Sequence, residues 1–304
     1  MGRVGRKASL AALARAYEGG VNYFDVARSY GYGRAEGVLG EFLQGRRDQC
    51  IVTTKMGIQP SLPSYASRFV LPMLRFAASR LSGLQSLSAR RGERLSGVSG
   101  GHFEVPNLRA SVETSLSELA TDYVDILLLH EVAAEDLKRD EILRLLQDVV
   151  SEGKARAIGL ATSSAESLRI LKDSASVDVV QVPNSIWEPC PQALVEGAGF
   201  LLTHSAMAVD ESGREALRTA LERSPELAED LREAGFLGSD STWGIPEILL
   251  AWALASNPNG ITLCGMLKPQ HVASNLSTLV RVTRGSQALL DLGRAVASSR
   301  LERA

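Results

Sequence analysis

Short apolar runs alternate with amphipathic helical patterns along most of this chain, and this alternation restricts its fold more than any other feature. The runs predict strands near residues 21–26, 50–55, 124–130, 155–161, 178–183, 199–204 and 260–264. They are continuous hydrophobic stretches, which are typical of strands buried on both faces of a parallel sheet. Parallel strands need long crossover connections, so the pattern predicts an α/β fold.

The segments between the runs have helical periodicity. Predicted helices cover residues 9–20, 34–43, 107–120, 140–153 and 245–260. Repeated strand–helix units over 304 residues favour a single (β/α)8 TIM-barrel domain spanning residues 1–304. An open doubly wound sheet is less favoured, because no G-x-G-x-x-G motif follows the first predicted strand.

Two irregularities modify the barrel prediction. Only seven strands are found, and the chain reaches a helical pattern almost at once, so the barrel is expected to be N-terminally shortened. Either a truncated start or a native lack of the first strand explains this, and the open edge needs a cover. Residues 58–104 form a long insertion rich in Ser, Gly, Leu and Arg, predicted to be a flexible surface excursion. A lid or docking arm is the alternative interpretation.

Composition excludes several classes of protein. The formal net charge is −2, so bulk electrostatics favour no nucleic-acid partner. The three cysteines lie far apart and predict free thiols in a reducing cytoplasm. No window holds ~18 uninterrupted apolar residues, and the N-terminus lacks the apolar core of a signal peptide. A cytoplasmic protein without a membrane partner is therefore expected, as a monomer or weak oligomer.

Three of the apolar runs close on titratable side chains, namely Asp25, Lys55 and His130, and Tyr30 follows Asp25 after five positions. The carboxyl ends of parallel strands meet at one edge, where active sites form. An ammonium beside a phenol stabilises the phenolate and makes the phenol a stronger acid. A carboxylate can balance a buried lysine, and a neutral imidazole can donate a hydrogen bond to a carbonyl oxygen. This set of side chains suits carbonyl reduction; no nucleophile elbow and no metal-ligand spacing accompanies it.

These residues lie in segments that resemble the aldo-keto reductase superfamily: "GVNYFDVARSYGYGRAEGVLGEFL", "IVTTKMG" and "SVETSLSELATDYVDILLLHE". The resemblance continues through "GKARAIGLAT", "VDVVQVPNSI" and "NGITLCGMLKPQHVASNL". It implies a (β/α)8 barrel and hydride transfer between a nicotinamide cofactor and a small carbonyl or sugar-like substrate. The implied cofactor is NADPH, with NADH as the alternative. It also implies that Tyr30 is the general acid, that Lys55 and Asp25 adjust its acidity, and that His130 orients the carbonyl.

The resemblance further implies a set of cofactor-binding residues. Gln181 would hold the nicotinamide amide, and His204 would stack beneath the ring, with Ser205 next to it. Lys268 would replace the usual phosphate-binding cation, and Asn275 matches an adenine-binding position. The proton-donating half of the site is thus complete in sequence.

The cofactor half departs from the family pattern. Ala161 and Thr162 stand where the family usually has Ser-Asn, and Gly265 and His271 stand where it often has Lys and Arg. A non-enzymatic or regulatory barrel that binds cofactor or a protein partner is therefore the main alternative function. A third hypothesis is elimination or isomerisation, with Tyr30 and Lys55 as acid and base and no nicotinamide.

Overall fold

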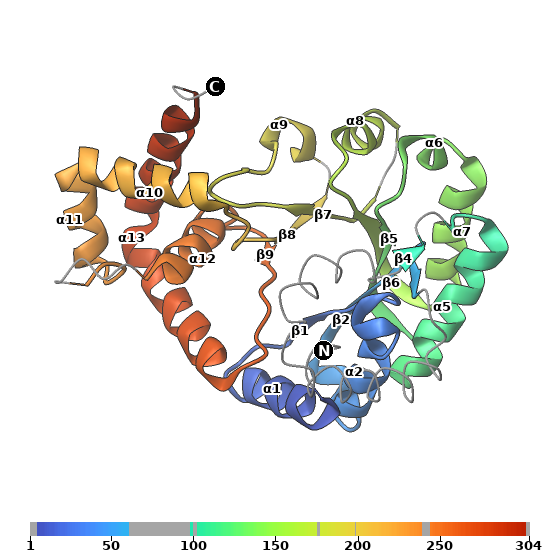
Figure 1. Cartoon of the computed structure of the whole chain (residues 1–304). Helices are drawn as coiled ribbons and strands as arrows, with labels where there is room; N and C mark the ends of the chain where they lie inside the picture. The colour runs from blue at the N-terminus through green and yellow to red at the C-terminus, as the bar shows by residue number, and fades with distance from the viewer. Residues whose placement is uncertain are drawn as a thin grey trace, which may run out of the picture. The chain divides into compact units, whose positions relative to one another are not determined.

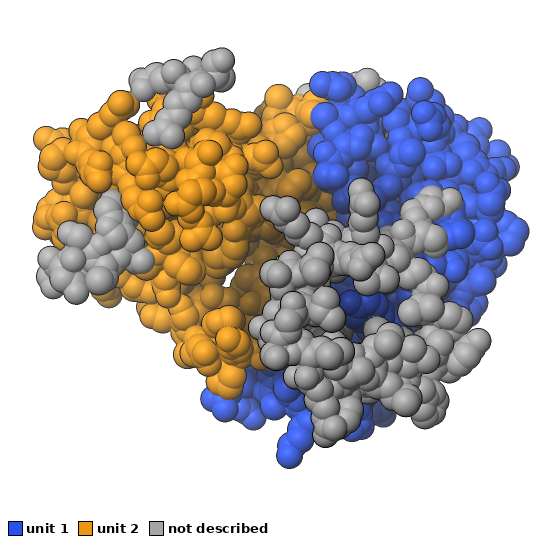
Figure 2. All heavy atoms as spheres, in the orientation of Figure 1, with its two compact units in different colours: residues 1–177 blue, residues 178–304 orange. Residues whose placement is uncertain are grey.

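A computed structural model describes residues 5–60, 98–99, 102–174, 177–197, 199–238 and 244–301. The chain divides into two compact units, residues 1–177 (unit 1) and residues 178–304 (unit 2), coloured blue and orange in Figure 2. Most of the insertion predicted at residues 58–104 lies outside the described residues, as do residues 1–4. The flexibility of the insertion therefore stays a prediction. The single domain over residues 1–304 also stays a prediction.

Unit 1 contains a parallel sheet with the strand order β1-β2-β5-β6. Its strands are β1 (Tyr23–Asp25), β2 (Ile51–Met56), β5 (Val124–His130) and β6 (Ala155–Ala161). In register, Asp25 pairs with Thr53, Lys55 with Leu128, and His130 with Ala161. The four strands predicted in this part of the sequence are confirmed.

Helices line the outer side of this sheet (Figure 1). They are α1 (Arg6–Glu18), α2 (Ala35–Leu43), α5 (Val105–Leu119), α6 (Ala134–Leu137), α7 (Asp140–Ser151) and α8 (Ala165–Ser174), with the 3-10 turns η1 (Tyr30–Tyr32) and η2 (Arg47–Gln49). The short strands β3 (Gln59–Pro60) and β4 (Val98–Ser99) pair antiparallel. The four helices predicted in this unit are all present.

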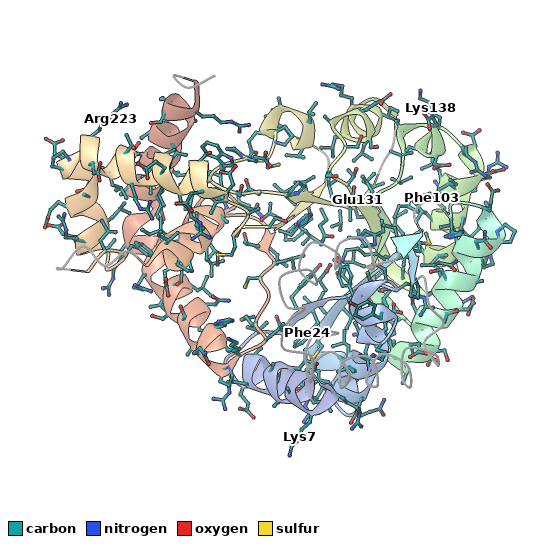
Figure 3. The ribbon with its side chains drawn as sticks, in the orientation of Figure 1. Lys7, Phe24, Phe103, Glu131, Lys138 and Arg223 are labelled. Carbon is teal, nitrogen blue, oxygen red and sulfur yellow. The ribbon has the colours of Figure 1, made fainter. Side chains whose placement is uncertain are left out.

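The core of unit 1 lies between the sheet and these helices. Every residue of Val124–Leu129 is buried, as expected for a strand covered on both faces. Phe24 and Phe103 are buried as well, whereas Lys7 and Lys138 project from the outer helices into solvent (Figure 3). The helix α7 likewise buries Ile142, Leu145, Leu146 and Val149, which recur at helical spacing on one face.

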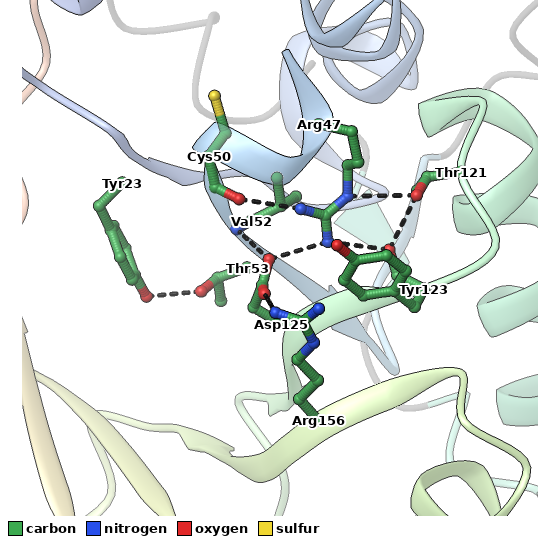
Figure 4. Close-up of polar contacts among 9 residues, drawn as sticks. All are labelled: Tyr23, Arg47, Cys50, Val52, Thr53, Thr121, Tyr123, Asp125 and Arg156. Carbon is green, nitrogen blue, oxygen red and sulfur yellow. Dashed lines mark hydrogen bonds and ion pairs between the residues drawn. The ribbon is translucent and has the colours of Figure 1, made fainter. Parts of the chain in front are cut away.

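A polar network fastens the amino-terminal ends of the strands in unit 1 (Figure 4). The Asp125 carboxylate, near the start of β5, pairs with Arg47 at 2.8 Å and Arg156 at 2.9 Å. It also accepts the Val52 N–H at 2.9 Å. The two guanidinium groups lie 4.0 and 4.3 Å from the centroid of the Tyr123 ring. This end of β5 is opposite to the end that carries His130.

Unit 2 contains three parallel strands, β7 (Val179–Pro183), β8 (Phe200–His204) and β9 (Ile261–Thr262). Its helices are α9 (Gln192–Val195), α10 (Glu211–Arg223), α11 (Pro225–Glu233), α12 (Ile245–Ala255) and α13 (Pro269–Leu301). The core packs α10, α12 and α13 together through side chains such as Leu217, Trp252 and Leu292. The three strands and the helix predicted for this half of the sequence are confirmed.

The cysteines are free thiols, as the sequence predicts. Cys50 and Cys190 are buried, and Cys264 is partly buried. Within the described ranges, no helix combines the length and the apolar character needed to cross a membrane.

Candidate active site

Lys55 is the centre of a buried cluster in unit 1. Its residue exposure is 1%, and an ammonium at such a depth needs acceptors for its three N–H donors. It donates to three oxygens: Asp25 Oδ1 at 2.5 Å, the Val26 carbonyl at 3.2 Å and the Tyr30 hydroxyl at 3.4 Å. Because every donor is engaged, Lys55 acts here as a fixed cation, and an imine-forming role fits it poorly.

The pairing of β1 with β2 explains how Lys55 meets its acid. Asp25 ends β1 beside Thr53, and Lys55 lies two residues further along β2. Residues two apart on a strand share a face, so the register brings the Lys55 amine to the end of β1. The Lys55 ammonium and the Asp25 carboxylate compensate each other's charge. Either ion buried without its partner would cost several kcal/mol.

A tight loop carries Tyr30 over this pair. Three consecutive residues after Tyr30 adopt left-handed backbone conformations: Gly31 (φ 62°), Tyr32 (φ 58°) and Gly33 (φ 78°). Two of them are glycines, which tolerate this region without strain. The resulting bend brings the Tyr30 ring centroid to 4.8 Å from Lys55 Nζ, while 41% of the residue stays exposed. The phenol thus contacts the ammonium and still reaches solvent.

His130 completes the cluster from the carboxyl end of β5. Its ring meets the Tyr30 ring edge-on, with the centroids 5.8 Å apart and an interplanar angle of 83°. The next residue, Glu131, has a left-handed φ of 51°, and its carboxylate accepts the Ser163 N–H at 3.0 Å and hydroxyl at 2.9 Å. The structure therefore brings together all four side chains that the sequence singles out for catalysis.

A buried carboxylate, Glu36, lies in the first turn of α2 and is not among the site residues predicted from the sequence. Its exposure is 1%; it pairs with Arg28 at 3.0 Å and accepts the Thr54 hydroxyl at 2.6 Å. The available signal was its helical position, since Glu36 shares a face with the buried Leu39 and Leu43. An acid on an apolar stripe requires a partner inside the protein.

The residues proposed from the family pattern as cofactor ligands belong to unit 2. Gln181 is buried in the middle of β7, with Leu202 of β8 beside it. His204 ends β8, and its Nδ1 lies 2.8 Å from the hydroxyl oxygen of Ser205, whose φ is 63°. His204 and Ser205 therefore lie at the carboxyl end of β8, whereas Gln181 lies two residues before the end of the neighbouring strand β7.

Lys268 and Asn275 lie at the amino-terminal end of α13. Lys268 is exposed and directly precedes the helix, where a cation and the helix dipole both favour an anion. Asn275 donates from Nδ2 to the Cys264 sulfur at 3.4 Å. A Cβ at Gly265 would find no atom within 4 Å, so this stretch of backbone leaves room at its surface.

The departures at Ala161 and Thr162 are visible in unit 1. Ala161 pairs in register with His130 and offers only a methyl group. Thr162 is fully buried, and its hydroxyl accepts the Ser164 N–H at 3.0 Å. Neither residue presents the Ser-Asn pair that the family pattern has at these positions.

Parallel strands joined by helices, with polar side chains gathered at the strand carboxyl ends, define an enzyme of the α/β-barrel class. A sequence profile of the aldo/keto reductase family matches residues 2–287, so the chain belongs to that family of oxidoreductases. The recognition made from the sequence motifs is confirmed.

Curated relatives agree with this assignment. Norsolorinic acid reductase stcV of Emericella nidulans is 31% identical over 167 residues, covering 54% of this chain and 36% of the relative. D-threo-aldose 1-dehydrogenase of a Pseudomonas species is 29% identical over 187 residues, covering 57% and 49%. The NADH-specific methylglyoxal reductase of Escherichia coli is 23% identical over 309 residues, covering 91% and 84%. The matched part thus spans half or less of the first two relatives.

Solved structures show the same fold. The holo form of aldo-keto reductase AKR11C1 from Bacillus halodurans superposes with a TM-score of 0.66 at 19% identity, covering 95% of this chain and 88% of that one. An aldo-keto reductase from Klebsiella pneumoniae in complex with NADPH gives 0.62 at 20% identity, covering 92% and 82%. The (β/α)8 fold class predicted from the sequence is confirmed.

Proposed function

We propose that this protein is an NADPH-dependent reductase that converts an aldehyde or ketone to an alcohol, or catalyses the reverse reaction. The observation that carries the proposal is the Lys55 ammonium, bound by Asp25 and donating to the Tyr30 hydroxyl, with His130 against the same phenol ring. Relatives named for methylglyoxal and aldose substrates support a small carbonyl or sugar-like compound.

The proposed roles follow from charge and exposure. Tyr30 gives its hydroxyl proton to the substrate oxygen, because it is the exposed member of the cluster. Lys55 stabilises the phenolate that remains, and Asp25 holds the ammonium in place. His130 donates a hydrogen bond that orients the carbonyl oxygen. A nicotinamide, when bound, would supply the hydride.

The chemistry of the unit 2 residues fits a dinucleotide. The Gln181 amide can pair with a carboxamide, and the His204 ring can stack with Ser205 beside it. Exposed Lys268 suits a phosphate, and Asn275 suits a purine edge. We propose NADPH as the cofactor, with NADH as the alternative; the relatives include an NADH-specific enzyme, and one structural neighbour holds NADPH.

Titration with NADPH and then NADH, followed by fluorescence, tests this proposal. Saturable binding together with turnover of methylglyoxal, an aldose or an aromatic ketone is the expected result. Stoichiometric binding without turnover on a wide carbonyl panel would instead support a non-enzymatic binding barrel, which the Ala161 methyl favours. Activity that survives complete removal of the cofactor would support acid–base elimination or isomerisation.

We also propose that residues 1–304 act as a single barrel domain, present as a monomer or a weak oligomer. The continuous family match over residues 2–287 supports the single domain. Sedimentation velocity over a range of concentrations measures the oligomeric state.

A further inference from the structure

Glu36 has a buried carboxylate that the proposed chemistry does not use. Its side chain is 2% exposed, and that of its partner Arg28 is 15% exposed. It also accepts a hydrogen bond from the buried hydroxyl of Thr54 at 2.6 Å. A charge at such depth is stable only when it has partners, so Arg28 and Thr54 hold the Glu36 carboxylate in place.

Arg28 and Glu36 flank the loop that carries the Tyr30 phenol, and Thr54 lies on the strand beneath it. Arg28 lies two residues before Tyr30, and Glu36 lies six residues after it. Thr54 directly precedes Lys55 on β2, and successive strand side chains leave on opposite faces. Glu36 therefore ties both flanks of the Tyr30 loop to the strand that also carries the ammonium.

The loop has few other constraints in the part that holds Tyr30. The Tyr30 N–H donates to the Ala27 carbonyl at 3.0 Å, and the Gly33 N–H donates to the Tyr30 carbonyl at 3.2 Å. Both bonds lie within the loop and do not hold it against the sheet. The Lys55 bond to the phenol is long, at 3.4 Å. Asp25 and Val26, at the start of the loop, are bonded to Lys55 and Thr53 of β2. The contacts of Glu36 add a link to β2 on the far side of Tyr30.

We propose that Glu36 is a positioning residue that, through Arg28 and Thr54, keeps the Tyr30 hydroxyl within reach of Lys55 Nζ. Its catalytic meaning rests on the proposed function, since Tyr30 is there the proton donor. The positional claim itself concerns only the loop and β2.

Hydrogen–deuterium exchange of Glu36→Gln tests the positional claim without any substrate. Glutamine keeps the shape and an acceptor for Thr54 but loses the charge that pairs with Arg28. Exchange over residues 26–36 should become at least about tenfold faster, while residues 124–130 stay protected. Thr54→Val removes the hydroxyl and should give a smaller effect of the same kind. Thr54→Ser keeps the hydroxyl, so exchange should stay as slow as in the wild type. These two variants keep the test decisive if Glu36→Gln fails to fold.

Asp125→Asn is the matched control. The Arg47–Asp125 pair has side-chain exposures of 15% and 11%, similar to those of the Arg28–Glu36 pair, but it lies at the other end of the sheet. Its loss should speed exchange near residue 125 and leave residues 26–36 unchanged. If Asp125→Asn and Glu36→Gln affect residues 26–36 equally, Glu36 has only a general structural role and the proposal is wrong.

A kinetic measurement then links position to catalysis. In an active enzyme, Glu36→Gln should lower kcat about 10- to 100-fold, because small misplacements of a reacting group are costly. The NADPH dissociation constant should change less than about threefold, and Asp125→Asn should keep its kcat. An unchanged kcat in Glu36→Gln would refute the positioning role. If the wild type turns over no carbonyl, the proposed function fails, and the exchange experiment still decides the positional claim.

Discussion

The Tyr30 hydroxyl lies 3.4 Å from Lys55 Nζ, although 25 positions separate the two residues in the chain. The ammonium also sits 4.8 Å from the centroid of the same phenol ring. One cation therefore contacts both the oxygen and the π-system of a single tyrosine. This relationship requires the register of β1 on β2 and the left-handed bend after Tyr30.

Replacing Tyr30 with Phe removes the proposed proton donor and little else. We expect kcat for carbonyl reduction to fall by roughly 10²- to 10⁴-fold, the usual contribution of a general acid. The NADPH dissociation constant, measured by fluorescence titration, should stay within about threefold of the wild-type value. Tyr32→Phe in the same loop is the control and should remain active. Appreciable reductase activity in Tyr30→Phe would show that another group supplies the proton.

The Lys55–Asp25 pair should show strong coupling in a double-mutant cycle. Lys55→Met or Asp25→Leu alone leaves a buried charge without its partner, and each should lower the free energy of unfolding by about 3–5 kcal/mol. The double variant should recover much of this loss but remain inactive. Urea unfolding of the four proteins measures the coupling, and additive losses would contradict it. Arg6→Gln, which removes an exposed ion pair with Glu41, should cost less than about 1 kcal/mol.

Two glycines of α2 provide a matched test of close helix packing. A Cβ at Gly40 would lie 2.4 Å from the Glu118 backbone oxygen on α5, whereas a Cβ at Gly37 would meet only the flexible end of the Glu118 side chain. Gly40→Ala should therefore destabilise the protein by about 1–3 kcal/mol. Gly37→Ala should be neutral or stabilising by up to ~1 kcal/mol, because alanine favours helices. Thermal unfolding compares the two, and equal effects would refute the packing argument.

Burial of Cys190 makes a defined contribution to the dependence of stability on pH. Burial raises the pKa of its thiol from the ordinary value of 9.0 to about 11. Because the folded pKa is the higher one, the stabilisation is complete below about pH 9 and is lost as the pH rises towards 11. The free energy of unfolding should therefore fall more steeply over this interval in the wild type than in Cys190→Ala. Urea unfolding at several pH values measures both slopes, and parallel curves would contradict the prediction.

Local sequence signals predicted the strands and the four side chains that meet in the candidate active site. The run that forms β5 and its terminal His130 could be predicted because burial on both faces leaves a continuous apolar stretch. Asp25 and Lys55 could be predicted because parallel strands bring their carboxyl ends together. The burial of Glu36 could not be predicted with the same certainty, since an acid in the first turn of a helix is ordinary at the surface. Its partner Thr54 carries no signal in a strand of β-branched residues.

The sequence alone determined the order of strands and helices and the side chain that each strand presents at its end, because hydrophobic periodicity acts over a few neighbouring residues. Only the tertiary structure decided which of those side chains touch. The three acceptors around Lys55 and the partners of Glu36 depend on strand register, on the bend after Tyr30 and on the packing of α2. Hydrogen bonds are sensitive to displacements of less than an ångström, and such precision arises only when the whole core has packed.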